Sequence, residues 1–322
     1  MAEIAENEER IFEYYLKLPK NVRNRAINKM KPDDRCRLTR CSKQCKEEAM
    51  ASRNYIYELK FTSYIDNRMK IKVQFGNRNN YFQPRYGYKL EFIIVRPDQK
   101  MKRYHGLGLY NPWEMRLDSS VDIVKLAVEE FKCLLESHQK TVRKIEFKDS
   151  PIGLLTNVDF KIESLDNLES LHITGQYDIR KMLSKLRHPL RDLHVDGEKN
   201  CEILASCEEI YQVQRSISAW GLKLDMQQYK RLTASDVHVN VQHLNERGVL
   251  KIIKSWQNGT IRRDVNLLCW KFEESKFDML RLWRLLRIRD QGIEELVEIK
   301  HYGAEGKVAM LVNFGEVLCF RT

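Results

Sequence analysis

Alternation of apolar and polar residues predicts β-strands between residues 55 and 95. Residues 55–61 and 69–75 alternate with period two, and residues 89–95 form a more continuously apolar run. Period two places successive side chains on opposite faces of a sheet, so each of these segments is expected to be a strand. The intervening stretch 76–87, GNRNNYFQPRYG, is rich in Gly and Asn and contains a Pro, which predicts a loop.

A helix is predicted over residues 118–140. Asp118 and Ser119 are expected to cap its N-terminus, because their side chains can accept hydrogen bonds from unpaired backbone N–H groups. Apolar residues then recur at helical spacing and form a broad face. They are Val121, Val124, Leu126, Val128, Phe131, Leu134 and Leu135.

A recurring motif predicts stacked strands between residues 142 and 195. Three copies of a Leu-x-x-Leu-x-Leu arrangement, with related apolar residues, begin at Val142, Leu168 and Leu190. The arrangement and its spacing are typical of leucine-rich repeats, whose units bury their apolar faces by stacking. Residues spaced for a helix lie between the last two copies, at Ile179, Met182, Leu183 and Leu186. The fold class predicted is therefore α/β, with an irregular leucine-rich-repeat-like solenoid.

Strand alternation also assigns an open face to this solenoid. Leu171 and Ile173 should point inward, and the polar residues between such positions should face outward. The predicted outward residues are Lys144, Glu146, Lys148, Ser170, His172, Thr174, Asp192, His194 and Asp196. A target protein would lie along this face, with Lys144, Glu146, Ser170, His172, Thr174, Asp192 and His194 as its candidate contacts. His172 and His194 are interpreted as surface histidines and not as metal ligands.

The C-terminal part is expected to close the solenoid. An apolar helix is predicted over residues 277–288, and strands are predicted over residues 296–300 and 308–314. An open repeat end would expose core residues, so a buried capping helix is expected here.

A short helical module is predicted over residues 16–46. Pro19 suits the first turn of a helix, where its missing N–H would have no partner. Residues 32–34, Pro-Asp-Asp, start a second helix and place carboxylates near its positive end. The apolar residues of the two helices are Val22, Ala26, Ile27, Met30, Leu38, Cys41 and Cys45. A helix pair that packs on its own domain is the alternative interpretation.

The module resembles an F-box, by which substrate receptors join a cullin-type ubiquitin ligase through its Skp adaptor. The resemblance rests on the Leu-x-Leu-Pro start at residues 16–19 and the Cys-Ser-Lys finish at residues 41–43. It implies that the adaptor is bound by Leu16, Leu18, Pro19, Val22, Ile27, Met30, Pro32 and Leu38. This copy is unusually basic, with Arg23, Arg25, Lys29, Arg35, Arg37 and Arg40.

The C-terminal part resembles the F-box-associated (type 2) domain of the large nematode F-box family. The segments that carry this resemblance are residues 232–236, 249–259 and 299–309. In that family a helix ending in Trp-x-x-Gly precedes another repeat strand, and Lys254, Trp256 and Gly259 match it. Gly259 is also expected to cap that helix at its C-terminus.

Together the two resemblances imply a non-catalytic substrate-recognition subunit of a Skp-cullin-F-box ubiquitin ligase. Its partners would be the Skp adaptor, the cullin scaffold and an unidentified target protein, with no cofactor or metal. The expected division is an acidic tail over 1–10, the F-box-like module over 11–53, a β-rich segment with its helix over 54–140, and the F-box-associated domain over 141–322.

Charge leaves two alternatives open. The chain has 56 Lys and Arg against 45 Asp and Glu, a net charge of +11. The Tyr- and Arg-containing loop at 76–87 adds to the case for a nucleic-acid-binding protein, although mixed charges along the chain favour an ordinary solvated surface. A protein-interaction scaffold outside any ligase is the other alternative.

Motifs and cysteine spacing bear on enzyme activity, metal binding and cellular compartment. No P-loop, dinucleotide fingerprint, HExxH or GxSxG motif is present, so we expect no intrinsic enzyme activity. The eight cysteines form no CxxC pair or zinc-finger spacing. An acidic start without an apolar stretch predicts no signal peptide, and no apolar run is long enough to cross a bilayer. We therefore expect a cytoplasmic or nuclear protein with reduced cysteines.

Overall fold

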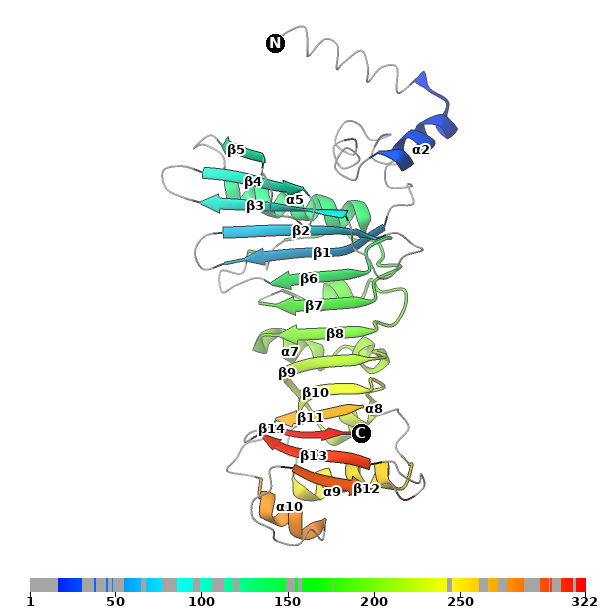
Figure 1. Cartoon of the computed structure of the whole chain (residues 1–322), viewed down its shortest axis with the longest axis vertical. Coiled ribbons are helices and arrows are strands. Elements are labelled where there is room, and N and C mark those ends of the chain that lie inside the picture. The colour runs from blue at the N-terminus through cyan, green and yellow to red at the C-terminus, as the bar shows by residue number, and fades with distance from the viewer. Residues whose placement is uncertain are drawn as a thin grey trace. The chain divides into compact units, whose positions relative to one another are not determined.

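The computed structural model divides the chain into two compact units (Figure 1). Unit 1 contains residues 1–143 and 159–165, and unit 2 contains residues 144–158 and 166–322. The structure describes residues 17–30, 38, 45, 48, 55–64, 68–76, 86–94, 99–105, 113–117, 122–148, 154–155, 158–175, 177–241, 245–260, 266–271, 277–286, 296–300, 302, 308–314 and 317–322.

Unit 1 is built on an antiparallel sheet whose strands follow one another in chain order. They are β1 (Tyr55–Ser63), β2 (Arg68–Gly76), β3 (Tyr86–Ile94), β4 (Gln99–His105) and β5 (Trp113–Leu117). The strands predicted from the alternating segments correspond to β1, β2 and β3 and are confirmed. The loop predicted over 76–87 is too long, because Gly76 belongs to β2 and Tyr86 and Gly87 belong to β3. Its residues 77–85 lie outside the described residues.

Helix α5 (Ile123–His138) packs on β1, β2 and β3. The predicted helix is confirmed, but the expected caps are wrong. Asp122 is the N-cap, and its carboxylate accepts hydrogen bonds from the backbone N–H groups of Val124 and Lys125 at 3.1 and 3.0 Å. The helix therefore begins later than the positions of Asp118 and Ser119 require.

Aromatic packing fixes α5 and a returning segment to this sheet. The ring of Phe131 lies 5.3 Å from that of Phe61 and 6.1 Å from that of Phe160, measured between centroids. Gln139 Oε1 accepts a hydrogen bond of 2.6 Å from the backbone N–H of Glu163. Glu136 Oε1 accepts a hydrogen bond of 2.7 Å from the backbone N–H of Lys161. Residues 159–165 therefore belong to unit 1 through contacts with the C-terminal end of α5.

Unit 2 contains a sheet whose first six strands are parallel. In spatial order these are β6 (Lys144–Lys148), β7 (Ser170–Thr174), β8 (Asp192–Asp196), β9 (Ser216–Leu224), β10 (Asp236–Val241) and β11 (Leu267–Lys271). The antiparallel strands β14 (Val317–Arg321), β13 (Val308–Phe314) and β12 (Leu296–Lys300) follow. The predicted strands 296–300 and 308–314 are confirmed, and the α/β class is confirmed with them.

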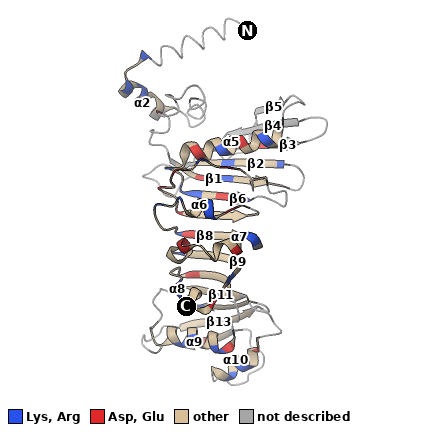
Figure 2. Ribbon diagram, turned by 180° about the vertical axis from the view of Figure 1, so that it is seen from behind, with Lys and Arg blue, Asp and Glu red and all other residues tan. Residues whose placement is uncertain are grey.

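The helices of unit 2 connect these strands. They are α6 (Arg180–Leu183), α7 (Glu198–Leu204), the 3-10 helix η1 (Glu208–Gln212), α8 (Met226–Arg231), α9 (Glu246–Gln257) and α10 (Met279–Leu285). Figures 1 and 2 show α6, α7, α8 and α9 on one side of the sheet. The helix expected between the last two motif copies is present as the short α6, with Met182 and Leu183 buried in it and Ile179 buried at its N-cap. Leu186, also expected in that helix, follows its end and is half-buried.

The three motif copies fall into register. In the parallel register, Lys144 of β6 lies opposite Ser170 of β7, and Ser170 lies opposite Asp192 of β8. The following residues of β6, β7 and β8 pair in the same register. Leu171 and Ile173 are fully buried, as the alternation predicted, while Ser170, His172 and Thr174 are half-buried. The apolar positions of the motif therefore point to the helix side of the sheet, and the polar positions point to the opposite face.

Helix α9 ends at a glycine, as expected. Gly259 has φ of +64°, a left-handed conformation that favours glycine because it has no Cβ. Its N–H donates to the Trp256 carbonyl at 3.0 Å, and the Thr260 N–H donates to the Ser255 carbonyl at 2.8 Å. This pair of bonds satisfies helix-end carbonyls in a Schellman motif.

Helix α10 is shorter than the predicted 277–288. Its N-cap Asp278 accepts a hydrogen bond from the Arg281 N–H at 3.0 Å, and the helix packs on α9. Leu282 and Trp283 are buried, but Leu280 and Leu285 are exposed. The expected buried capping helix is thus buried on one side only.

Candidate partner-binding surfaces

The first candidate surface lies at the start of α2 (Lys20–Lys29). Pro19 precedes the helix and its carbonyl accepts hydrogen bonds from the N–H groups of Val22 and Arg23 at 2.9 and 3.0 Å. Leu18 and Val22 are exposed, at 39% and 41% of their full surface. Isolated exposed apolar residues are common on proteins, but Leu18 and Val22 lie close together at the start of one helix.

Three further adaptor-binding candidates, Ile27, Met30 and Leu38, are less exposed. Ile27 and Leu38 are buried and form a small core with Cys45, against which the half-buried Met30 packs. Ile27 and Leu38 therefore cannot touch a partner directly in this conformation and instead support the surface from beneath. Leu16 and Pro32 lie outside the described residues.

One of the basic residues is buried. Arg23 is 8% exposed, and its Nε lies 2.9 Å from both carboxylate oxygens of Glu48. Its Nη2 also contacts Glu48 Oε1 at 2.5 Å, and Nη1 donates to the Leu18 carbonyl. This two-point ion pair fixes the Arg23 guanidinium against its own module, so its charge is neutralised locally.

The second candidate surface is the face of the unit 2 sheet opposite α6–α9. Register pairing places one residue from each of several strands side by side, and we call this set the central row. It consists of Glu146, His172, His194, Ser218, His238, Cys269 and Cys319, from β6 to β11 and then β14. Of the predicted target-binding residues, Glu146, His172 and His194 belong to the central row. Lys144, Ser170 and Asp192 form a neighbouring row, and Thr174 lies beyond.

Glu146 departs from the prediction that it is exposed. It is 7% exposed, because Lys144 Nζ lies 3.8 Å and His172 Nδ1 lies 3.7 Å from its carboxylate oxygens. Long neighbouring side chains on the same face cover the carboxylate. Strand alternation alone cannot predict this burial, because it assigns a residue to a face without considering its neighbours. Glu146 therefore acts on this face chiefly as a buried acceptor.

The histidines of the central row pack on one another. The rings of His172 and His194 lie 4.0 Å apart between centroids with an interplanar angle of 68°. Partial burial lowers the pKa of His194 below 6.5, against the opposing effect of Asp196 and Glu146. Burial also lowers the pKa of His238, opposed by Asp236 and assisted by His194. The face can therefore offer neutral imidazoles, which both donate and accept hydrogen bonds.

The sequence interpretation missed the second half of this face. Trp220, which is exposed, lies 5.6 Å from His238 between ring centroids at an angle of 89°. The missed signal was a further motif copy with small residues, Ala234-x-x-Val237-x-Val239. His238 occupies the same position in this copy as His172 and His194 in theirs, between the last two apolar residues. At the edge of the same face, Arg215 forms an ion pair of 2.6 Å with Asp192.

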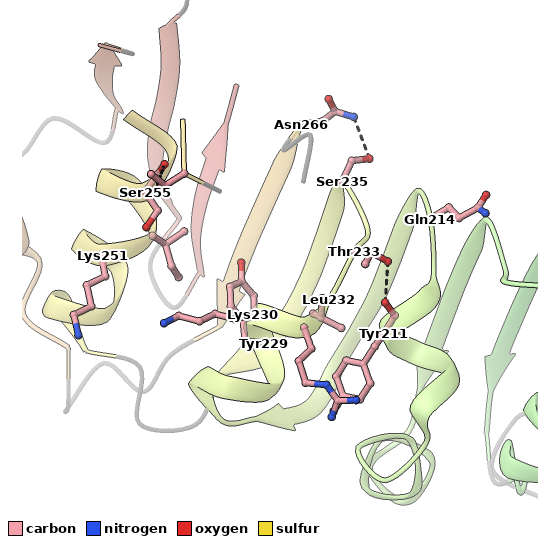
Figure 3. A pocket seen from close by; sticks show the side chains of 13 residues that line it. Tyr211, Gln214, Tyr229, Lys230, Leu232, Thr233, Ser235, Lys251, Ser255 and Asn266 are labelled. Carbon is pink, nitrogen blue, oxygen red and sulfur yellow. Dashed lines mark hydrogen bonds between the residues drawn. The ribbon is translucent and has the colours of Figure 1, made fainter. Parts of the chain in front are cut away.

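A groove of about 1300 Å³ lies between α8 and α9 in unit 2 (Figure 3). Among the described residues, its lining contains the cations Lys230, Arg231 and Lys251 and no carboxylate. Arg231 stacks 3.9 Å above the Tyr211 ring and pairs with Glu208. Figure 3 shows Lys230 extending from α8 toward α9. An anionic group would be accommodated here by charge.

In the part of the chain that the structure describes, His, Cys, Asp and Glu do not gather in groups of three or more able to hold a metal ion. None of the described helices has the length and apolar content that crossing a bilayer requires. Comparison with protein-family models, curated proteins and solved structures found no match.

Proposed function

We propose that this protein is the substrate-recognition subunit of a Skp-cullin-F-box ubiquitin ligase. Its N-terminal module would dock on the Skp adaptor, and the open face of unit 2 would bind a target protein. Its contribution to ubiquitin transfer would be positioning of the target, with the covalent chemistry carried out by its partners.

The proposal that the N-terminal module binds the Skp adaptor rests on the contrast between exposed and buried apolar residues in that module. Leu18 and Val22 remain exposed at the start of α2, while Ile27 and Leu38 form a core beneath them with Cys45. A helix that presents apolar side chains above its own small core is suited to insertion into a partner's groove. The F-box resemblance names the Skp adaptor as that partner.

The basic character of this module is compatible with docking. Arg23 forms a two-point ion pair with Glu48 inside the module, so it does not present an unpaired charge to the adaptor. Exposed cations such as Arg25 can lay their alkyl stems on a partner while the charged end stays in water.

The target-binding half is supported by the parallel strands of unit 2. Their in-register pairing and the helices on one side fit a leucine-rich-repeat-like solenoid of the F-box-associated type. Such a solenoid would leave the half-buried residues of the central row and their neighbours available to an extended protein surface. Imidazoles, hydroxyls and the exposed Trp220 supply hydrogen bonds and apolar area on that face.

The test is a binding assay between the purified full chain and the Skp adaptor. We expect the wild type to bind, and the double variant Leu18→Asp, Val22→Asp to lose binding at least tenfold. The matched control is Leu280→Asp, Leu285→Asp, which introduces the same charges at exposed leucines of α10. A folded wild type without adaptor affinity, or equal loss in both variants, would reject the adaptor proposal.

A nucleic-acid-binding protein is the second candidate function, favoured by the groove with Lys230, Arg231 and Lys251 and by the net charge of +11. It requires oligonucleotide affinity that falls steeply with salt. The variant Lys230→Glu, Lys251→Glu should then abolish most of that affinity. Oligonucleotide affinity that is absent at low salt, or unchanged in this variant, rejects a role for the groove.

A further inference from the structure

Two cysteines meet across neighbouring strands of unit 2. Cys269 lies in the middle of β11, Cys319 lies in the middle of β14, and the two are direct partners in the antiparallel register. Their Sγ atoms are 2.6 Å apart. A disulfide bond is about 2.05 Å long, so the two sulfur atoms lie within reach of bond formation.

The surrounding residues hold the two thiols in this position. Leu268 and Phe320 form the register pair on one side of the cysteines, and Trp270 and Leu318 form the pair on the other. All four are fully buried on the helix side of the sheet. The backbones of β11 and β14 are therefore fixed by packing, and the cysteine side chains share the opposite face.

The two thiols are chemically different. Cys269 is 3% exposed, whereas Cys319 is half-buried and is the more accessible of the two. The contact between the two thiols lowers the pKa of Cys319 and raises the pKa of Cys269, and the burial of Cys269 raises its pKa further. Thiolates attack disulfides and thiols do not, which makes Cys319 the attacking group and Cys269 the resolving group.

Two further buried thiols, Cys201 and Cys207, do not share this arrangement. Burial raises the pKa of Cys201 to about 11, and burial also raises the pKa of Cys207. Cys201 instead donates to the Val195 carbonyl and Cys207 to the Ile203 carbonyl. These thiols are in the less reactive, protonated form at neutral pH.

We propose that Cys269 and Cys319 are a modification site that closes to a reversible disulfide with an oxidant of the glutathione disulfide class. The Cys319 thiolate attacks one sulfur of the oxidant, forms a mixed disulfide and releases one glutathione thiolate. That thiolate takes the proton from Cys269, whose sulfur then attacks Cys319 and displaces the second glutathione. The second glutathione leaves as a thiolate and takes up the proton that Cys319 released to solvent on ionising. The protein thus loses two hydrogen atoms, and one glutathione disulfide becomes two glutathione thiols.

Closure would change the C-terminal part of unit 2. Strand β14 lies between β11 and β13, and the two cysteines are 50 residues apart in the chain. The bond would join β14 covalently to the last parallel strand and restrict the unfolded chain between them. Cys269 is also the register neighbour of His238, so the modification lies within the central row. The disulfide chemistry itself does not depend on the ligase proposal.

The experiment uses the full chain, first reduced and then incubated with glutathione disulfide. After denaturation, free thiols are alkylated and peptides are analysed by mass spectrometry with and without reduction. We expect a linked peptide pair containing Cys269 and Cys319 that reduction releases. In Cys269→Ser, a stable glutathione adduct on Cys319 should accumulate. In Cys319→Ser, neither the linked pair nor an adduct on Cys269 should form.

The buried thiol variant Cys201→Ser is the matched control and should form the linked pair at the wild-type rate. Recovery of both Cys269 and Cys319 as alkylated thiols from the oxidised wild type would overturn the proposal. Linkage of either cysteine to a different partner would overturn it as well. The wild-type result decides the question even if a serine variant fails to fold.

Discussion

The imidazole rings of His172 and His194 pack edge to face, 4.0 Å apart, on directly paired residues of β7 and β8. Protonating both rings would place two cations in contact on a face that already excludes part of their water. His238 continues the same row, and its pKa is lowered in part by His194. The central row is therefore suited to neutral histidines and has a defined response to acid.

Stability of unit 2 should fall as pH decreases below about 6.5. The pKa values of His194 and His238 are lowered by folding, so the unfolded chain binds more protons than the folded chain in this range. The free energy of unfolding is thus highest above the unfolded pKa of 6.5 and declines as pH passes through the folded values. The facing groups Glu146, Asp196 and Asp236 oppose this effect without reversing it.

Urea denaturation at pH 7.5, 6.5 and 5.5 measures this effect. The double variant His194→Asn, His238→Asn should lose part of the pH dependence between these values. His188→Asn, which changes an exposed histidine of the same unit, is the control and should keep it. The same slope in the double variant and the wild type would show that other groups cause the acid sensitivity.

Truncation of Arg23 should destabilise the N-terminal module strongly. Arg23→Ala leaves the Glu48 carboxylate buried without its guanidinium partner, which costs about 3–5 kcal/mol for comparable buried pairs. Hydrogen exchange of residues 20–30 should accelerate accordingly, while exchange of α5 should change little. Arg25→Ala, at an exposed position of the same helix, should have a small effect.

A double substitution distinguishes an uncompensated buried charge from other effects of losing Arg23. Arg23→Met combined with Glu48→Leu removes both charges and keeps apolar volume, so most of the lost protection should return. If the double variant exchanges as fast as Arg23→Ala, the module depends on the charges themselves. That outcome would contradict a cost that arises from the loss of the guanidinium contact with the Glu48 carboxylate.

Substitution of Gly259 should destabilise the end of α9. Gly259→Ala forces a Cβ into a left-handed conformation at φ of +64°, with an expected cost of about 1–2 kcal/mol. Asn258→Ala is the matched control, because Asn258 has φ of −87°. Chemical denaturation measures both, and equal stabilities of the two variants would contradict the assigned role of the Schellman motif.

Local patterns in the sequence were sufficient to predict much of the fold. Alternation identified β1, β2, β3 and the inward positions of β7, because burial along a strand alternates from one residue to the next and is therefore visible in the local sequence. The motif copies at 142, 168 and 190 identified three strands that the structure pairs in register. Strands β12 and β13 were also found with the correct bounds.

Some of the features that were missed depend on residues far apart in the chain, and others lie in strands whose local pattern is irregular. Arg23 and Glu48 are 25 residues apart, and Cys269 and Cys319 are 50 apart, so no periodicity relates them. Strand β9 was missed because its sequence, SISAWGLKL, contains Gly221 and shifts register against β10. Glu146 was assigned to the surface because strand alternation does not count the neighbours that cover it.

Regular pairing from β6 to β8 has a consequence for how this protein could change through evolution. Each added strand lengthens the open face by about 4.8 Å and brings one more residue into line with Glu146, His172 and His194. A partner whose contact groups are spaced at multiples of that distance could contact every strand of the face at once. Gain or loss of one strand unit would then alter the length of partner that fits, while each remaining strand keeps its own chemistry.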